Sequence, residues 1–306
     1  MGKRTAGVTF LSIIILYFVL VIFLLVTADR VNISIAGSCI LSEGIIILPA
    51  LIAALVTTKG KDTLKSLGFK KIKFTTLLAV LLYGLLLMPL TTLINAITML
   101  FVDNTFVSSS DSILGIGFPV AFIIMALYGP FCEEFAFRGV IFRGFSKENK
   151  GWGALILSSL LFGLMHMNLN QCAYAFVLGT CFAMVVEATG SIWASIACHV
   201  LFNAINIIEM FAIDKLIPGY YNSDAAAAAM SSDALIMMIG VLFIVASITT
   251  VLAMCLLGWI AHREGNEHPF KSLKGKKGPL LTAPLVVAIC LAAAYIIYDT
   301  YLMIMV

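Results

Sequence analysis

Several ionisable and amide side chains stand inside strongly apolar stretches of this sequence, where they could carry out chemistry. Two adjacent carboxylates and an arginine lie in one stretch, a histidine in a second, and a histidine with an asparagine in a third. Ionisable groups inside apolar, membrane-type segments are costly and by default indicate a functional site. The candidate residues are Glu133, Glu134, Arg138, His166, His199 and Asn203.

Such a set of side chains suits the hydrolysis of a peptide bond. A carboxylate and a neutral imidazole that face one cavity can take a proton from a water molecule between them. A second imidazole and an amide can donate hydrogen bonds to the oxyanion that forms when this water attacks a carbonyl group. Metal chemistry is an alternative, because Glu133, His166 and His199 would supply three zinc ligands and leave one position for water. The residue types leave both chemistries open.

Spacing within each helix predicts different roles for these residues. Glu134 and Arg138 are four residues apart, so they lie on one helix face and can neutralise each other as an ionised structural pair. Glu133 points about 100° away from Glu134 and is left free for chemistry. His199 and Asn203 are also four residues apart, so both project to the same side.

Other polar residues in apolar stretches are interpreted as structural. Glu43, Asn95 and Glu187 stand apart from the candidate set, and a single polar side chain within the membrane often forms an interhelical hydrogen bond. We expect these three side chains to stabilise helix packing.

The amino-acid composition indicates what kind of fold must hold the candidate site. Of the 306 residues, 61% are hydrophobic and 11% are charged, and the mean hydropathy is +1.08. A soluble domain carries about 25% charged residues, so the chain is predicted to be an integral membrane protein. A nucleic-acid partner is excluded, because no basic face is backed by a soluble fold. We expect one domain, residues 1–306, folded as an all-α polytopic membrane helix bundle.

Nine apolar stretches are candidate membrane helices, since a span needs about 20 apolar residues. We expect about eight or nine transmembrane helices, because the fifth and sixth stretches are short and joined by a tight, re-entrant-like hairpin at residues 168–171. The stretches are 8–27, 35–57, 74–101, 117–145, 153–168, 171–187, 192–212, 234–260 and 280–303.

The depth of each candidate residue indicates that the fourth to seventh stretches form one core. At about 1.5 Å per residue, Glu133 and His166 lie about 18 and 20 Å from the inner ends of their helices. His199 and Asn203 lie about 11 and 17 Å from theirs by the same rule. Separate helices therefore bring an acid, two imidazoles and an amide to a similar level.

The distribution of lysine and arginine predicts the orientation. If the N-terminus lies on the cytoplasmic side of the membrane, every lysine and arginine except Arg30 and Lys215 falls on that side, as the positive-inside rule requires. We therefore expect a multi-pass protein of the cell membrane, with a cytoplasmic N-terminus and an external C-terminus. Segment 58–73 carries apolar residues such as Leu67 and Phe69 among its lysines and is predicted to lie along the inner leaflet of the lipid bilayer.

Three motifs in this region resemble those of the CPBP family, also called CAAX proteases and bacteriocin-processing enzymes, or the Abi family. That family is marked by EExxxR, FxxxH and HxxxN motifs on successive membrane helices. All three motifs occur here in that order between residues 133 and 203. The resemblance covers the core 115–212. The motifs read Glu133-Glu134 with Arg138, Phe162 with His166, and His199 with Asn203.

The resemblance implies an intramembrane endopeptidase, a hydrolase acting on peptide bonds. It implies that Glu133 and His166 activate water, while His199 and Asn203 form the oxyanion hole. Many family members are described as metalloproteases. We expect no required cofactor, because the Glu133–His166 pair already contains a base and a relay and because His199 shares its task with Asn203. If zinc is present, Glu133, His166 and His199 would hold it.

The substrate expected from the resemblance is a membrane-embedded or lipidated peptide or protein. The short chain with positive-inside loops is typical of the bacterial plasma membrane, where prenylated CAAX substrates are generally lacking. A peptide pheromone, a bacteriocin precursor or a membrane-protein segment is therefore favoured. Two other functions remain open: a non-catalytic family scaffold for bacteriocin self-immunity or sensor regulation, and a proton-coupled transporter.

Overall fold

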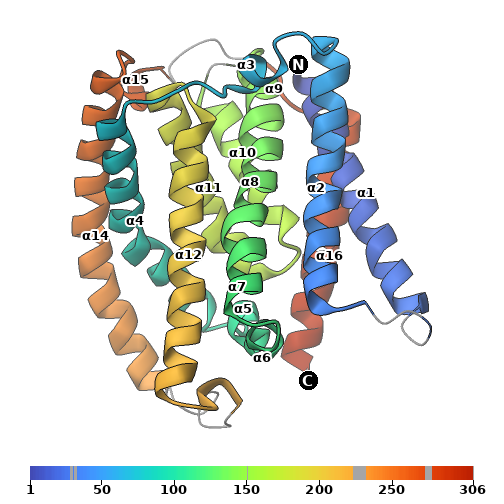
Figure 1. Cartoon of the computed structure of the whole chain (residues 1–306), viewed down its shortest axis with the longest axis vertical. Coiled ribbons are helices and arrows are strands. Elements are labelled where there is room, and N and C mark those ends of the chain that lie inside the picture. The colour runs from blue at the N-terminus through green and yellow to red at the C-terminus, as the bar shows by residue number, and fades with distance from the viewer. Residues whose placement is uncertain (28–29, 31–32, 150, 223–231, 273–277, 306) are drawn as a thin grey trace.

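The computed structural model of the chain is built from helices, and no strand occurs among the residues that it describes (Figure 1). These are residues 1–27, 30, 33–149, 151–222, 232–272 and 278–305. The helices that run the length of the bundle, singly or in segments, are α1 Lys3–Thr27, α2 Ile35–Thr58, α4 Phe74–Thr98, the segments α7 Phe118–Ala121, η1 Phe122–Tyr128, α8 Gly129–Glu134, η2 Phe135–Phe142 and α9 Arg143–Ser146, then α11 Leu169–Thr189, α12 Ile192–Leu216, α14 Ser232–Arg263 and α16 Ala283–Met305. The shorter helices are α3 Thr63–Leu67, α5 Thr105–Ser108, α6 Ser110–Gly115, α10 Trp152–Met165, η3 Tyr220–Asn222 and α15 Pro269–Ser272.

Eight helical stretches of the described chain are long and apolar enough to cross a membrane. The prediction of an all-α, multi-pass membrane bundle is therefore confirmed. One length differs from expectation. The fifth predicted stretch is short, as expected: it becomes α10, which has 14 residues, because the chain turns after Met165. The sixth was expected to be short, but α11 has 21 residues and is long enough to span.

Burial separates central helices from lipid-facing ones. In the apolar window of α11, 61% of the residues are buried, whereas the figure for α14 is 11%. The exposed side chains of α14 are largely apolar, as in Phe243, Ile248 and Val251. Exposed apolar side chains along a whole helix fit contact with hydrocarbon rather than water. The candidate site therefore belongs to the centre of the bundle, where α11 lies.

The fourth predicted helix, 117–145, is not a regular α-helix. Two π-helical stretches, η1 and η2, flank the short α8 that carries the two adjacent glutamates. At the first junction the N–H of Gly129 donates to the carbonyl of Ile124, five residues back, and Pro130 has no N–H to donate. Wide turns of this kind are rare and often lie at functional sites. They set the direction in which the glutamates point.

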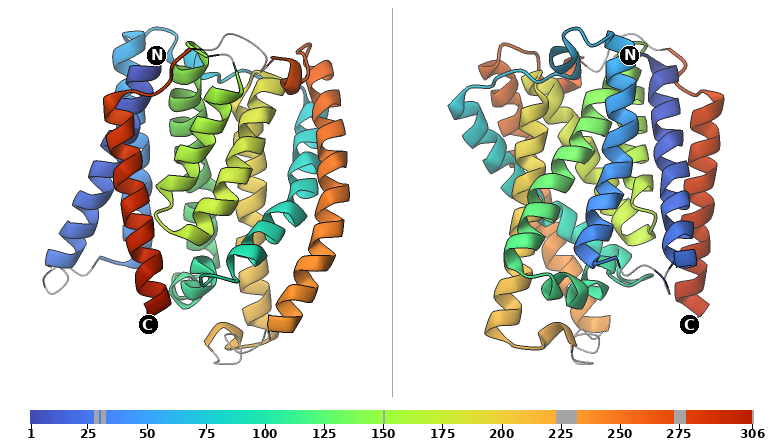
Figure 2. Two further views of the ribbon diagram at one scale, coloured as in Figure 1. Left: turned by 180° about the vertical axis from the view of Figure 1, so that it is seen from behind. Right: turned by 45° about the vertical axis from the view of Figure 1, so that its right-hand side comes forward.

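The hairpin between α10 and α11 reverses the chain within a few residues, as predicted (Figure 2). Met167 has a positive φ of 56°, which turns the backbone sharply. Asn168 then caps α11, because its side-chain oxygen accepts the N–H of Gln171 at 2.8 Å. Asparagine is a favoured residue at this capping position. The loop thereby fixes where α10 ends and where His166 lies.

The N-terminus lies at one end of the bundle together with α3, α9 and α15, and the C-terminus lies at the other end (Figure 1). The segment 59–73, which contains six lysines, lies at the N-terminal end. Two apolar side chains of segment 58–73, which was predicted to lie along the inner leaflet, pack against the protein. Leu67 is fully buried in the protein, and the ring of Phe69 lies 5.2 Å from that of Trp193. These side chains anchor the segment to the bundle.

Candidate active site

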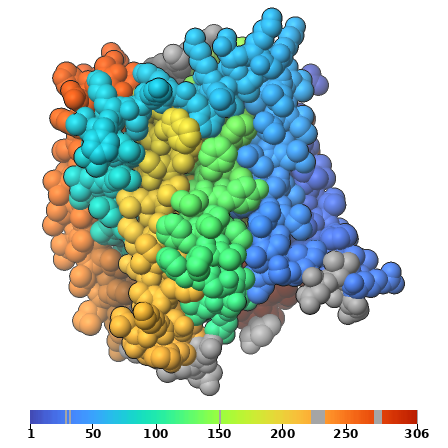
Figure 3. Space-filling model, in the orientation of Figure 1, coloured from blue at the N-terminus to red at the C-terminus, as the bar shows by residue number. Residues whose placement is uncertain are grey.

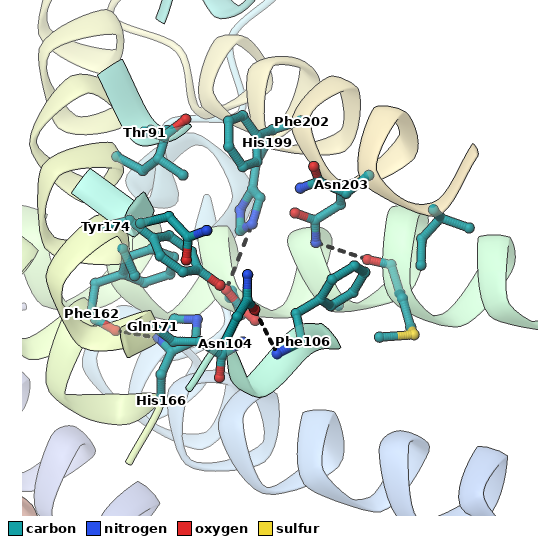
Figure 4. A pocket seen from close by; sticks show the side chains of 18 of the residues that line it. Thr91, Asn104, Phe106, Phe162, His166, Gln171, Tyr174, His199, Phe202 and Asn203 are labelled. Atoms are coloured by element: carbon teal, nitrogen blue, oxygen red, sulfur yellow. Dashed lines mark hydrogen bonds and ion pairs between the residues drawn. The ribbon is translucent and has the colours of Figure 1, made fainter. Parts of the chain in front are cut away.

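The polar residues of the three motifs gather at the centre of the bundle. Glu133 lies in the last turn of α8, His166 follows α10, and His199 and Asn203 lie one turn apart on α12. All four line one cavity of about 460 Å³. Figure 4 shows His166, after α10, and His199 and Asn203, on α12, directed toward this space. The structure therefore brings together the four residues that were predicted to act on substrate.

The cavity extends from these four residues toward the C-terminal end of the bundle. Its far wall includes Asn104 and Phe106 at α5, and Glu209 on the lower part of α12. Figure 3 shows α12 and the α7–α9 stretch side by side on the surface, with α2 adjoining them. The cavity therefore extends into the half of the molecule that lies away from the N-terminus.

Glu134 is turned away from the cavity and connects two of the motifs. Its Oε1 lies 3.0 Å from Nη1 of Arg138 and 3.1 Å from Nδ1 of His199. The Glu134 and Arg138 side chains are 0% and 2% exposed, and Nη2 of Arg138 donates to the Gly179 carbonyl at 3.1 Å. Glu134 thus contacts a histidine as well as the arginine that spacing alone had paired with it.

Aromatic rings enclose the buried guanidinium group. The Cζ atom of Arg138 lies 4.2 Å from the centre of the Phe162 ring and 5.4 Å from that of Phe182. Phe162 also meets His166 edge to face at 5.2 Å, and Phe182 packs against His199 at 4.9 Å. Phe162 therefore connects the arginine to a histidine of the cavity. Phe182 belongs to none of the motifs and gave no signal in the sequence.

The contact with Glu134 assigns the proton positions on His199. An ionised carboxylate only accepts hydrogen bonds, so Nδ1 of His199 must carry the donating hydrogen. The other nitrogen, Nε2, faces the cavity and lies 3.8 Å from Oε2 of Glu133. Nε2 can donate to an oxyanion only when the ring is an imidazolium.

Glu133 and His166 each present an acceptor that a water molecule could use. Nδ1 of His166 lies 2.9 Å from the Phe162 carbonyl, which can only accept, so Nδ1 donates and Nε2 keeps its lone pair. Glu133 is 9% exposed, and its Oε2 has no hydrogen-bond partner among the described residues. A carboxylate oxygen and an imidazole nitrogen are thus both available in the same cavity.

Asn203 already uses part of its hydrogen-bonding capacity. Its Nδ2 donates to the carbonyl of Met125 in η1 at 2.9 Å. The amide nitrogen carries two hydrogens, so one donor remains for another acceptor. The bond to Met125 also fixes the orientation of the amide beside the π-helical stretch.

The turn that holds His166 is anchored by amides that lie outside the three motifs. Asn168 donates to the His166 carbonyl at 2.8 Å. Asn170 donates to Oδ1 of Asn95 and Oγ1 of Thr98, both at 2.8 Å. Asn95 therefore has the structural interhelical role that was predicted for it. The polar run at residues 168–171 between two apolar stretches was the signal for this anchor.

Glu43 does not have the structural role that the sequence suggested. Its side chain lines the same cavity as Glu133, and its Oε2 is buried without a hydrogen-bond partner in the described part of the chain. Sequence reasoning missed it as a site residue because α2 lies outside the motif-bearing core. The structure adds a second carboxylate to the cavity.

The residues considered as zinc ligands do not gather as a metal-binding set. Among the described residues, no group of three or more His, Cys, Asp or Glu side chains is placed to hold a metal ion. Nδ1 of His199 is engaged by Glu134 and Nδ1 of His166 by a carbonyl, which leaves Nε2 of both rings free, and Nε2 of His199 is 3.8 Å from Oε2 of Glu133. Hydrogen bonds of this kind also orient metal-ligating histidines, so whether the reaction uses zinc is decided by the metal analysis described in the Discussion.

Comparison with known proteins gives a family for this region. Residues 115–205 match the family model described as type II CAAX prenyl endopeptidase Rce1-like. The chain is also 30% identical over 90 residues to the "Putative membrane peptidase YdiL" of Bacillus subtilis. That alignment covers 29% of this chain and 37% of the relative. No solved structure matches the chain.

The matches cover the motif-bearing part of the chain and confirm its resemblance to the CPBP, or CAAX protease, family. The matched residues lie inside the predicted core 115–212 and contain all three motifs. The flanking helices α1, α2, α14 and α16 fall outside the match.

Proposed function

We propose that this protein is an intramembrane endopeptidase of the CAAX type, which hydrolyses a peptide bond in a membrane-embedded or lipidated peptide or protein. The observation that carries the proposal is the convergence of Glu133, His166, His199 and Asn203 on one cavity inside an apolar bundle. Hydrolysis requires a base for water and donors for an oxyanion. The cavity holds side chains suited to both.

In the proposed reaction, Glu133 and His166 activate water. A water molecule between Oε2 of Glu133 and Nε2 of His166 gives up a proton as its oxygen forms a bond to the scissile carbonyl carbon. Nε2–H of the His199 imidazolium and the free Nδ2–H of Asn203 donate to the resulting oxyanion. When the C–N bond breaks, the abstracted proton passes to the leaving amine, so atoms and charge balance.

Glu134 and Arg138 act in this proposal by positioning other groups. Glu134 holds Nδ1–H of His199, which orients the ring and stabilises its protonated form. Arg138 balances the charge of Glu134 and is itself fixed by the Gly179 carbonyl and the Phe162 ring. Neither side chain lines the cavity. Their effect on the reaction passes through His199.

We also propose that the N-terminal end of the bundle faces the cytoplasm of a bacterial cell. The lysine-rich segment 59–73 at that end supports this orientation through the positive-inside rule. The cavity would then extend toward the outer half of the membrane. A substrate would approach from that half or sideways from the bilayer.

The experiment that tests the proposal compares wild-type protein with Glu133→Gln and His166→Gln. Each variant is reconstituted in vesicles with a library of membrane-derived peptides, and new peptide termini are identified by mass spectrometry. Loss of a positioned base lowers rates by about 10²–10⁴-fold, so we expect cleavage to fall by that factor in both variants. Glu267→Gln, an exposed site outside the cavity, is the matched control.

Two outcomes of this experiment would overturn the proposal. Near-wild-type cleavage by Glu133→Gln would show that Glu133 is not the base. Absence of cleavage by well-folded wild-type protein, together with a cellular phenotype that Glu133→Gln preserves, would instead support a non-catalytic scaffold.

A further inference from the structure

Glu43 and Glu133 form a pair of carboxylates that the mechanism above uses only in part. They lie on α2 and α8 and together line both the main cavity of about 460 Å³ and an adjoining one of about 150 Å³. The Oε2 atom of each is buried and has no hydrogen-bond partner among the described residues. Glu133 has a task in water activation, whereas Glu43 has none.

Glu43 forms no ion pair with a lysine, arginine or histidine among the described residues. Glu134, the third buried glutamate, is paired with Arg138 and His199, and Oε2 of Glu133 lies 3.8 Å from Nε2 of His199. In contrast, no lysine or arginine lines the main cavity in the described part of the chain, and a further carboxylate, Glu209, lies on its far wall. Uncompensated buried charge is costly. A cationic group that entered the cavity would supply the missing counter-charge.

A glycine allows the Glu43 carboxylate to lie against α8. A Cβ atom added to Gly129 would lie 3.3 Å from Oε1 and 3.4 Å from Cδ of Glu43. Both distances are tighter than ordinary van der Waals contact, so a side chain at residue 129 would displace the carboxylate. Gly129 stands four residues before Glu133, one turn along the same stretch of helix. The close approach therefore holds Glu43 near the proposed base.

The remaining polar lining of the cavity suits an extended peptide backbone. Amide side chains both donate and accept hydrogen bonds, which matches the alternating N–H and C=O groups of an extended chain. A free C-terminal carboxylate would meet carboxylates here and no lysine or arginine. The amides that line the cavity are Asn95, Gln171, Asn203 and Asn206, with Asn104 at its far wall.

We propose that Glu43 binds the cationic side chain of a lysine or arginine near the scissile bond of the substrate peptide. This inference rests on the proposed endopeptidase function and specifies the substrate class: an internal segment with a basic residue, rather than a free C-terminus. Glu133 remains with the catalytic water, and Glu43 holds the ammonium or guanidinium group. The cation and Glu43 then neutralise each other inside the bundle.

The first test measures binding without cleavage. Two blocked, fluorescently labelled pentapeptides, Leu-Leu-Lys-Leu-Leu and the same peptide with norleucine in place of lysine, are titrated onto full-length Glu133→Gln protein in nanodiscs. We expect the lysine peptide to bind at least tenfold more tightly. The preference should fall to less than twofold in the double variant Glu133→Gln/Glu43→Gln. A tenfold preference that survives removal of Glu43, or no preference in Glu133→Gln protein, would refute the inference.

The second test reads the sequence around cleaved bonds. The peptide library described above is incubated with the wild type, Glu43→Gln, Gly129→Ala and the control Glu267→Gln. We expect lysine and arginine to be enriched within three residues of the cleaved bonds for the wild type and the control. The enrichment should be lost in Glu43→Gln and reduced in Gly129→Ala, which keeps the carboxylate but displaces it.

Together, the two tests distinguish a failure of the cation site at Glu43 from a failure of the proposed endopeptidase function. Cleavage without basic enrichment would overturn the role of Glu43 and leave the endopeptidase in place. A lysine preference in binding that depends on Glu43, without any cleavage by the wild type, would support the cation site and overturn the endopeptidase. Melting curves of each variant identify misfolded protein, and Gly129→Ala gives a second way to perturb the site if Glu43→Gln does not fold.

Discussion

Nδ1 of His199 lies 3.1 Å from Oε1 of Glu134, which connects the first and third motifs directly. The two residues are 65 positions apart in the chain. The carboxylate sets which nitrogen of the ring carries hydrogen and leaves Nε2 toward the cavity. The second glutamate of the EExxxR motif therefore acts on the cavity through His199.

The buried ion pair between Glu134 and Arg138 should be needed for stability. Arg138→Ala leaves an uncompensated carboxylate at a site that is 0% exposed, and breaking a buried pair in this way costs about 3–5 kcal/mol. We expect a lower melting temperature and lower abundance in the membrane. Lys147→Ala, which removes an exposed cation, should change neither. Normal stability with loss of activity alone would show that the pair positions His199 without stabilising the fold.

The amide of Asn203 should support the transition state rather than substrate binding. Asn203→Leu keeps the approximate size but removes the free Nδ2–H, and loss of one oxyanion donor lowers kcat by about 10²–10³-fold. Asn206→Leu, on the same wall of the cavity, should mainly raise KM. Steady-state kinetics on any peptide cleaved by the wild type distinguishes the two effects. Equal loss of kcat in both variants would contradict the assignment.

The crossing of α10 and α11 should not tolerate a side chain at residue 163. A Cβ atom on Gly163 would lie 2.6 Å from the Cys172 carbonyl oxygen, so the backbones must move apart. Overpacking of this kind costs about 1–3 kcal/mol, and the shift would also move His166. Gly240→Ala, where nothing lies within 4 Å of the added Cβ, should be neutral. The measurement is thermal unfolding of both variants; equal melting temperatures would show that the crossing is not tight.

Water activation should proceed without a stoichiometric metal ion. Glu133 and His166 present a base and a relay, and the possible donors are not gathered as a metal-binding set among the described residues. We therefore expect chelators to leave peptide cleavage by the purified protein unchanged, and elemental analysis to find less than one zinc per chain. One zinc per chain, lost together with activity on chelation and restored on readdition, would show that a metal is required.

The sequence determined the helical, membrane-embedded class and the order of the motifs. Apolar stretches of the right length predict spans irrespective of how they pack, so the nine predicted segments reappear as helices or interrupted helices. Spacing of four residues likewise placed Arg138 beside Glu134, because that relation is local to one helix. Such features depend on residues that are close in the chain.

Only the tertiary structure decided which residues share the cavity and what each of them contacts. The π-helical stretches around α8, the contact between Glu134 and His199, and the place of Glu43 beside the motif residues follow from how separate helices pack. Glu43 and Glu133 lie on different helices far apart in sequence, and no periodicity relates them. Helical periodicity fixes the face of each helix, but the neighbour that this face meets is determined by packing of the whole bundle.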